Sequence, residues 1–286
     1  MANLRTRCGA FGKENVRKER WFCWWRFPNA LALDAALAAV CWQEAAARFC
    51  GALLGWEHGC LLAAAVWLGY VADRWLDGRS IGPGRAFSER HRLAIRWRRE
   101  LFWTWGCVLC MSFGLAWASL GRIELLAGAV LALACAGNAA LAQATKHRFV
   151  PSKEVRTAVL FAGGVFFFSF MNSHGWAVED ILPCFVAFVA LCFLNCGIIA
   201  CWEREVDLRQ GQSSMATRKE EDMNNLFRLG AAVLVTACLW QGAPFFLGVG
   251  SVALALVALD LSNVTVENKR VLADLALLAP WPFIAS

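Results

Sequence analysis

The sequence predicts an all-α polytopic membrane protein with nine transmembrane helices. Hydrophobic residues make up 59% of the 286 residues and charged residues only 17%, a balance too apolar for a soluble domain of this length. The apolar residues gather in nine runs, and the charged residues lie mostly between these runs. Such runs are typical of helices that cross a bilayer, because a helix satisfies its backbone hydrogen bonds internally.

Each apolar run is interpreted as one span. The runs cover residues 29–49, 52–72, 101–119, 123–144, 156–172, 180–202, 227–242, 244–260 and 271–286. Several are shorter than the roughly 20 residues that cross a bilayer unaided, so we expect some helices to be tilted or buried by their neighbours. Gly242-Ala243-Pro244 separates two runs that together are too long for one straight span, which favours two helices there.

The residues before the first span form a separate segment. Residues 1–28 are basic and rich in tryptophan, and they contain no apolar run long enough for a signal peptide. Aromatic residues beside Arg20 and Arg26 are typical of an anchor at the membrane interface. We therefore expect an interfacial arm over 1–28, followed by a single transmembrane domain over 29–286.

The basic residues predict which side of the membrane each loop occupies. With nine spans and the amino terminus inside, every Lys and Arg except Arg48 and Arg122 falls on the inner side. Because positively charged loops tend to stay in the cytoplasm, we expect the inner (cytoplasmic) membrane, with the amino terminus and the loops after the second, fourth and sixth spans cytoplasmic. The net charge of +6 therefore indicates topology, and no nucleic-acid partner is expected.

Two pairs of carboxylates follow the second and sixth spans. Asp73 and Asp77 form the first pair, Glu203 and Asp207 the second, and the members of each pair lie four residues apart. On a helix this spacing places both acids on one face, one turn apart. Arg and Lys surround them, which suits an anionic ligand that arrives with Mg²⁺, a cation that prefers carboxylates, waters and phosphate oxygens. The four acids are therefore the predicted metal ligands and catalytic residues, although each pair alone also fits a surface ion pair.

Further polar residues are candidates for binding the substrate. They comprise basic side chains that could pair with phosphate oxygens and two polar side chains within spans, where such groups are costly and often functional. These candidates are Arg74, Lys146, Arg148, Lys153, Arg204, Asn195 and Asp34. An apolar cavity beneath them would accept a hydrocarbon tail, so the implied ligand is a prenyl diphosphate.

The second acid pair resembles a motif of the UbiA superfamily of intramembrane prenyltransferases. Residues 203–207, Glu-Arg-Glu-Val-Asp, are followed by Gly211 and Ser214. This series resembles the family pattern Asp-x-x-x-Asp-x-x-x-Gly-x-x-Ser, with Glu in place of the first Asp. In that family the motif follows the sixth span, as it does here.

The first acid pair resembles the other family motif, Asn-Asp-x-x-Asp-x-x-x-Asp, in reduced form. Asp73 and Asp77 match its last two acids, whereas Gly69 and Tyr70 stand where the family has Asn-Asp. Residues 146–148, Lys-His-Arg, are similar to the family's basic loop after the fourth span.

The resemblance implies nine helices around a central apolar cavity, and a Mg²⁺-dependent enzyme that ionises an isoprenyl diphosphate and transfers the prenyl group to an acceptor. A terpene cyclase of the same superfamily, which needs no external acceptor, is the first alternative. The second alternative, from another class, is a membrane transporter or scaffold whose acids serve only as topology and ion-pair residues.

Overall fold

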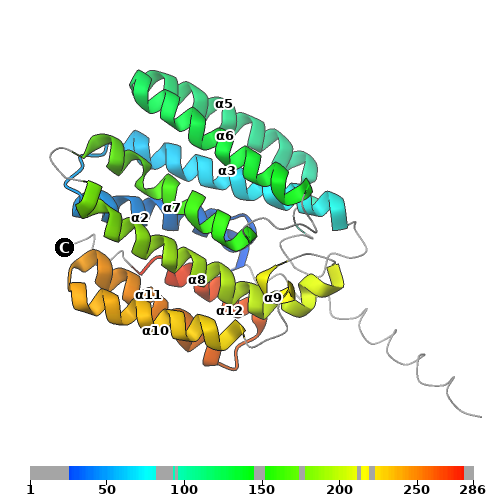
Figure 1. Cartoon of the computed structure of the whole chain (residues 1–286). Coiled ribbons are helices and arrows are strands. Elements are labelled where there is room, and N and C mark those ends of the chain that lie inside the picture. The colour runs from blue at the N-terminus through cyan, green and yellow to red at the C-terminus, as the bar shows by residue number, and fades with distance from the viewer. Residues whose placement is uncertain are drawn as a thin grey trace, which may run out of the picture.

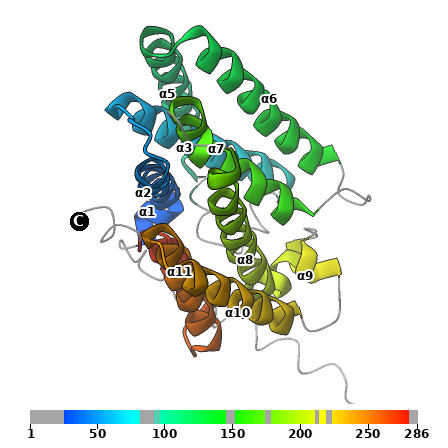
Figure 2. The ribbon, with the colours of Figure 1, turned by 60° about the vertical axis from the view of Figure 1, so that its left-hand side comes forward.

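The computed structural model describes residues 26–81, 93, 96–144, 152–173, 178–210, 214–218 and 223–279, and the regular elements within these ranges are all helices. In chain order the helices are α1 (Phe27–Ala30), α2 (Leu33–Phe49), α3 (Trp56–Ile81), α5 (Arg98–Ser119), α6 (Arg122–Ala144), α7 (Lys153–Asn172), α8 (Val178–Gln210), α9 (Met215–Arg218), α10 (Met223–Gln241), α11 (Pro244–Leu261) and α12 (Val266–Ala276). The long helices lie side by side in a bundle (Figures 1 and 2). The predicted all-α fold is confirmed.

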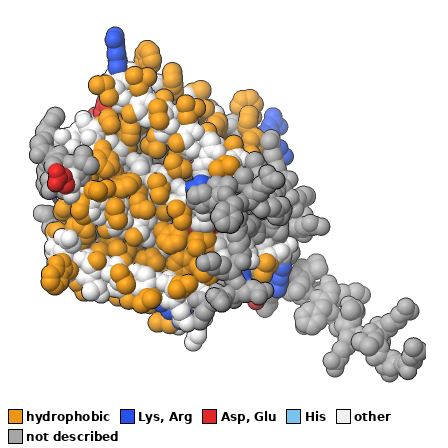
Figure 3. All heavy atoms as spheres, viewed as in Figure 1, with side chains coloured by type: hydrophobic (Ala, Val, Ile, Leu, Met, Phe, Trp, Pro, Cys, Tyr) orange, Lys and Arg blue, Asp and Glu red, His pale blue; other side chains and the backbone are white. Residues whose placement is uncertain are grey.

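The surface of the bundle is apolar. Among the described helices, six are long and apolar enough to cross a membrane, namely α5, α6, α7, α8, α10 and α11. Large apolar side chains of α5 and α6, including Phe113, Trp117, Leu126 and Leu133, are exposed. Apolar side chains cover much of the face shown in Figure 3. Soluble monomers rarely expose apolar patches of this extent, so the chain is an integral membrane protein.

The predicted count of nine spans is not confirmed. Helix α2 coincides with the first predicted span and α12 overlaps only the start of the ninth, and they contain 17 and 11 residues. A helix needs roughly 20 residues to cross a bilayer unaided. Helix α3 is 26 residues long, but its last third carries Asp73, Arg74, Asp77 and Arg79. These helices belong to the bundle, although their own length or composition does not identify them as spans.

Both acid pairs lie within helices, whereas the sequence placed them at the start of loops. Helix α3 continues to Ile81 and α8 continues to Gln210, well beyond the predicted ends at residues 72 and 202. An apolar run reflects the thickness of the membrane, whereas polar residues with good helix propensity carry the helix on into water. Each pair therefore sits on one helical face, as its spacing predicts.

Gly242 and Pro244 end one helix and begin the next, as predicted. Gly242 has a φ of +66°, a left-handed conformation that glycine adopts at little cost. Pro244 then occupies the first turn of α11, where its missing N–H would have no partner in the helix. Helices α10 and α11 consequently pack beside each other (Figures 1 and 2).

Aromatic rings fill the half of the bundle away from the acid pairs. Trp42 of α2, Phe166 of α7, Phe188 of α8 and Phe245 of α11 are all buried. The ring centroids of Trp42 and Phe188 lie 4.8 Å apart, and those of Phe166 and Phe245 lie 5.8 Å apart. Phe188 precedes Glu203 by about four turns of α8, or roughly 22 Å. Because aromatic side chains fill this half of the bundle, the candidate site is sought at the other end.

Candidate functional site

The first acid pair contacts the start of α7. Asp73 of α3 lies 3.4 Å from the Lys153 ammonium, and both side chains are partly exposed. The next residue along α7, Glu154, is buried and accepts a hydrogen bond of 2.9 Å from the backbone N–H of Met215 in α9. The start of α7 thus connects α3 with the short helix α9.

The part of α8 that carries the second acid pair contacts α9 through Arg204 and α12 through Glu203. Arg204 of α8 donates its Nε–H to the Ala216 carbonyl of α9, at 2.9 Å. Its neighbour Glu203 forms an ion pair of 2.9 Å with Arg270 of α12, and both of these side chains are largely buried. Asp207 is buried as well. Since α9 also contacts α7, the two acid pairs lie at the same end of the bundle.

A hydrogen-bonded set of polar side chains connects α12 back to α3. Asn29 of α1 donates its side-chain N–H groups to Asp34 of α2, at 2.6 Å, and to Asp274 of α12, at 2.5 Å. Arg74 of α3 is buried and donates to the backbone carbonyls of Asn29, at 3.0 Å, and of Ala30. Asp274 lies one turn beyond Arg270 on α12, so these contacts continue from the Glu203–Arg270 pair.

Together these contacts form a closed circuit through α3, α7, α9, α8, α12 and α1, which we term the polar ring. Its side chains are Asp73, Arg74, Lys153, Glu154, Glu203, Arg204, Arg270, Asp274 and Asn29. Charges of both signs alternate around it, and its acids and bases largely neutralise one another. Such an arrangement can bind an anion by exchanging a carboxylate partner for a phosphate partner.

Tyr70 lies close to the polar ring. It precedes Arg74 by one turn of α3, and 37% of its surface is accessible. A Cβ built at the preceding Gly69 would meet no atom within 4 Å, so this part of α3 is not closely covered by its neighbours. The central cavity that the sequence predicts remains a prediction.

Three buried polar atoms in or near the polar ring have no hydrogen-bond partner. They are Asn195 Oδ1 on α8, Glu154 Oε2 on α7 and Ser214 Oγ just before α9. Buried polar atoms are usually paired, because leaving one unpaired costs stability. Atoms of this kind are the ones that a polar ligand would engage.

The carboxylates fit Mg²⁺ in their chemistry but do not form a preassembled metal cluster. Within the part of the chain that the structure describes, no three His, Cys, Asp or Glu side chains lie together so as to hold a metal ion. Mg²⁺ bound with phosphate typically takes only one or two carboxylates, along with waters and phosphate oxygens. Asp73, Glu203 and Asp207 offer such hard oxygen donors at one end of the bundle.

Some predicted site residues lie outside the described residues. Lys146 and Arg148 are among them, and the side chain of Asp77 is as well, although its backbone belongs to α3. The others are placed by the structure. Asp73, Arg74, Lys153, Glu203 and Arg204 take part in the polar ring, Asp34 and Asp207 lie beside it, and Asn195 lies deeper in α8.

The sequence motifs did not identify Asn29, Glu154 and Arg270 as members of this site. Each meets its partner across helices, which spacing along one helix does not reveal. Arg270 and Asp274 do carry a signal, because they lie four residues apart at the start of a predicted span. Glu154 carries a weaker one, as an acid beside a predicted phosphate-binding lysine.

The bundle has the fold of a known class of membrane protein. No protein-family model matches the chain, and no curated protein sequence matches it. A solved structure, the apo structure of a UbiA homolog from Aeropyrum pernix K1, is similar over 88% of this chain and 97% of that chain, with a TM-score of 0.63 and 13% sequence identity. The protein is therefore an all-helical integral membrane protein with the UbiA fold, as the motifs predict.

Proposed function

We propose that the protein is a member of the UbiA superfamily and a Mg²⁺-dependent intramembrane prenyltransferase, which ionises an isoprenyl diphosphate and transfers the prenyl group to an acceptor. The main support is the polar ring, because it gathers residues of both acid pairs at one end of a bundle of apolar helices. A charged mouth over an apolar interior suits a ligand with a diphosphate head and a hydrocarbon tail.

Each part of the site would have a distinct role. Asp73, Asp77, Glu203 and Asp207 would hold Mg²⁺, which would supply positive charge to the leaving diphosphate. The basic side chains would bind the phosphate oxygens, and these are Arg74, Lys146, Arg148, Lys153 and Arg204. Asn195 and Asp34 would orient the substrate by hydrogen bonds.

The protein's own side chains would promote ionisation, because they stabilise both the negative diphosphate and the positive allylic cation that form when the bond breaks. As the C–O bond to the diphosphate breaks, its electron pair leaves with the diphosphate and is stabilised by the preoriented basic groups. The allylic cation forms in the interior, where aromatic faces such as that of Tyr70 favour positive charge. The surrounding helices exclude water, so the cation survives until the acceptor captures it.

The orientation of the protein is part of the proposal. The polar ring would face the cytoplasm of a cell whose inner membrane holds the protein, because the basic loops follow the spans that end at the ring. Soluble prenyl diphosphate would then enter head outward, with its tail in the bilayer core.

A terpene cyclase is the second candidate. It is favoured by Tyr70, which stands where the family motif has an acid and places an aromatic ring one turn from Arg74 of the polar ring. A cyclase needs π faces to stabilise a travelling cation and needs no external acceptor.

Turnover of prenyl diphosphates tests both candidates. Membranes that contain the protein are incubated with geranyl, farnesyl and geranylgeranyl diphosphate and Mg²⁺, with and without a lipid extract as acceptor source. Diphosphate release that depends on the extract supports the transferase, whereas hydrocarbon formed without it supports the cyclase. If Asp73→Ala and Asp207→Ala both retain wild-type binding and turnover of the diphosphates, the metal-site model fails. If the wild-type protein turns over none of the three diphosphates, a transporter or scaffold is favoured.

A further inference from the structure

A separate pocket lies at the end of the bundle opposite the polar ring. Its volume is about 340 Å³, and it lies between the end of α2 and the start of α3. Its lining residues are Val40, Gln43, Glu44, Leu54, Gly55, Trp56, Gly59, Cys60 and Ala63. Gly59 precedes Asp73 by about four turns of α3, roughly 21 Å of rise, so the pocket is distinct from the proposed active site.

One polar side chain that lines this pocket has a buried atom without a hydrogen-bond partner. Gln43 is only 2% exposed, and its Nε2 makes no hydrogen bond. The amide could be turned so that either of its polar atoms faces the pocket, whose other lining atoms are largely apolar. Since a buried amide without a partner lowers stability, a ligand oxygen that accepts from Gln43 would be bound favourably.

The mouth of the pocket combines a charge pair with exposed apolar residues. Glu44 lines the pocket and forms an ion pair of 2.9 Å with Arg48, one turn further along α2. Leu53, on the connection to α3, and Trp56, the first residue of α3, are among the most exposed apolar side chains of the described residues. An aromatic and an apolar side chain beside a cation are typical of the region where lipid tails meet headgroups.

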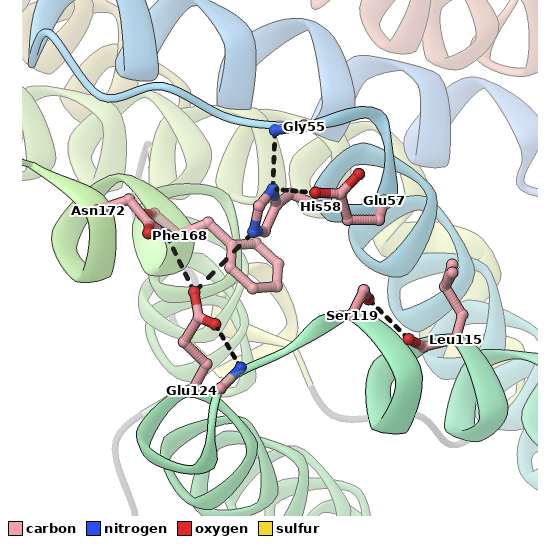
Figure 4. A network of polar contacts seen from close by, with 9 residues as sticks. Gly55, Glu57, His58, Leu115, Ser119, Glu124, Phe168 and Asn172 are labelled. Carbon is pink, nitrogen blue, oxygen red and sulfur yellow. Dashed lines mark hydrogen bonds and ion pairs between the residues drawn. The ribbon is translucent and has the colours of Figure 1, made fainter.

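A polar network holds one wall of the pocket in place. The backbone N–H of Gly55 donates to His58 Nδ1 at 3.0 Å, and His58 Nε2 lies 3.9 Å from Glu124 of α6 (Figure 4). Glu124 in turn accepts from Asn172 at the end of α7, at 3.0 Å, and from the backbone N–H of Gly121 at 2.9 Å. Three helices therefore fix the turn that carries Gly55, so the pocket is preformed.

We propose that this pocket binds one membrane glycerophospholipid. An acyl chain would lie along Val40, Cys60 and Ala63, an ester carbonyl would accept from Gln43, and the phosphate would face Arg48 at the mouth. Arg48 lies next to the pocket, because its Nε is 2.9 Å from the carboxylate of Glu44, which is a lining residue. A lipid is favoured over a soluble ligand because Leu53 and Trp56 at the mouth belong in a bilayer.

A second groove in the protein provides a matched control. It lies on α10, has a volume of about 600 Å³ and is lined by Ala232, Val233, Thr236, Ala237, Trp240 and Gln241. These side chains are exposed or nearly so, and none is a buried polar group without a partner. Lipid that merely coats the apolar surface should occupy this larger groove at least as readily.

Native mass spectrometry of the purified full chain with added phosphatidylglycerol tests the proposal. Ala63→Trp fills the pocket and should reduce retained lipid at least tenfold, whereas Ala237→Trp in the control groove should leave retention unchanged. Gln43→Leu removes the amide while keeping the apolar bulk, and it should weaken retention roughly fivefold, as expected for one lost hydrogen bond. If Ala63→Trp does not fold, Gly59→Leu fills the same space.

Competition distinguishes a lipid from a free anion. Diacylglycerol, which lacks the phosphate, should be retained more weakly than phosphatidylglycerol, and inorganic phosphate should not displace the lipid. Equal retention by the wild type, the pocket-filling variant and Gln43→Leu would overturn the proposal. Full displacement by inorganic phosphate would also overturn it, because the site would then recognise only an anion. None of these outcomes depends on prenyl diphosphate turnover.

Discussion

The two acid pairs look equivalent in the sequence but differ in the structure. Asp73 in the first pair is 42% exposed, and its contact with Lys153 is long, at 3.4 Å. Glu203 in the second pair is 15% exposed, and its contact with Arg270, itself 12% exposed, is short, at 2.9 Å. The contact of Asp73 with Lys153 is therefore an exposed ion pair, whereas the contact of Glu203 with Arg270 is an internal ion pair.

This difference indicates that the exposed ion pair serves ligand binding and that the internal ion pair serves stability. An exposed ion pair adds little stability and can exchange its partner readily, so Asp73 and Lys153 are suited to meet metal and diphosphate. A buried ion pair is costly to break, because the remaining charge is left without compensation. Glu203 and Arg270 therefore hold α8 and α12 together as well as contributing charge to the ring.

The largest effect on stability is expected when the ion pair between Glu203 and Arg270 loses one member. Arg270→Leu should destabilise the protein by about 3–5 kcal/mol, because Glu203 would remain buried and charged. Thermal or denaturant unfolding in detergent measures the loss. The double variant Glu203→Leu with Arg270→Leu should recover most of that stability, and a double variant as unstable as Arg270→Leu would contradict an internal pair.

Removing the charge of Asp73 should impair catalysis and leave stability nearly unchanged. Asp73→Asn should lower turnover of the prenyl diphosphate by about 10²–10³-fold, as expected for loss of one preoriented charge at the leaving group. Its free energy of unfolding should change by less than about 1 kcal/mol, because the lost ion pair is exposed. Unchanged turnover would show that the first acid pair is not part of the catalytic site.

A change at Tyr70 tests whether the first pair is a reduced metal site. Tyr70→Asp restores an acid at the position where the family motif has one, and it should lower the Mg²⁺ concentration for half-maximal activity by about tenfold, since one more carboxylate is available. Tyr70→Phe is the control and should leave this concentration unchanged. An equal response of both variants would show that Tyr70 acts only by packing.

The smallest effect on stability is expected at Lys153. Lys153→Met should change the free energy of unfolding by less than about 1 kcal/mol, because the side chain is exposed and keeps its apolar stem after the substitution. Its effect should appear instead as a kcat lowered by about tenfold or more, because Lys153 no longer stabilises the departing diphosphate. A destabilisation as large as that of Arg270→Leu would remove the proposed difference between the two pairs.

The sequence predicted the fold better than it predicted helix lengths. Apolar runs located the bundle helices, and Gly242 with Pro244 located the break between α10 and α11. The run of residues 52–72 did not reveal that α3 continues to Ile81, because apolarity reports burial in the membrane and not the end of a helix. The run of residues 29–49 likewise did not reveal that α2, with 17 residues, is too short to span a bilayer unaided.

The candidate site was predictable only in part. Spacing within one helix placed Asp73 near Asp77 and Glu203 near Asp207, and both helices do end at the same side of the bundle. The partners were not predictable, because Lys153 and Arg270 meet these acids from other helices. Register between helices depends on packing, which a single sequence does not specify residue by residue.

The short connection between α10 and α11 also bears on how the chain enters the membrane. No Asp, Glu, Lys or Arg lies between Arg228 and Asp260, and only Gly242 and Ala243 separate the two helices. So short and uncharged a linker cannot hold one helix in the bilayer while its partner waits in water. We therefore expect the two helices to enter the bilayer together as a helical hairpin, whose flanking residues Arg228 and Asp260 form an ion pair of 2.6 Å at one end.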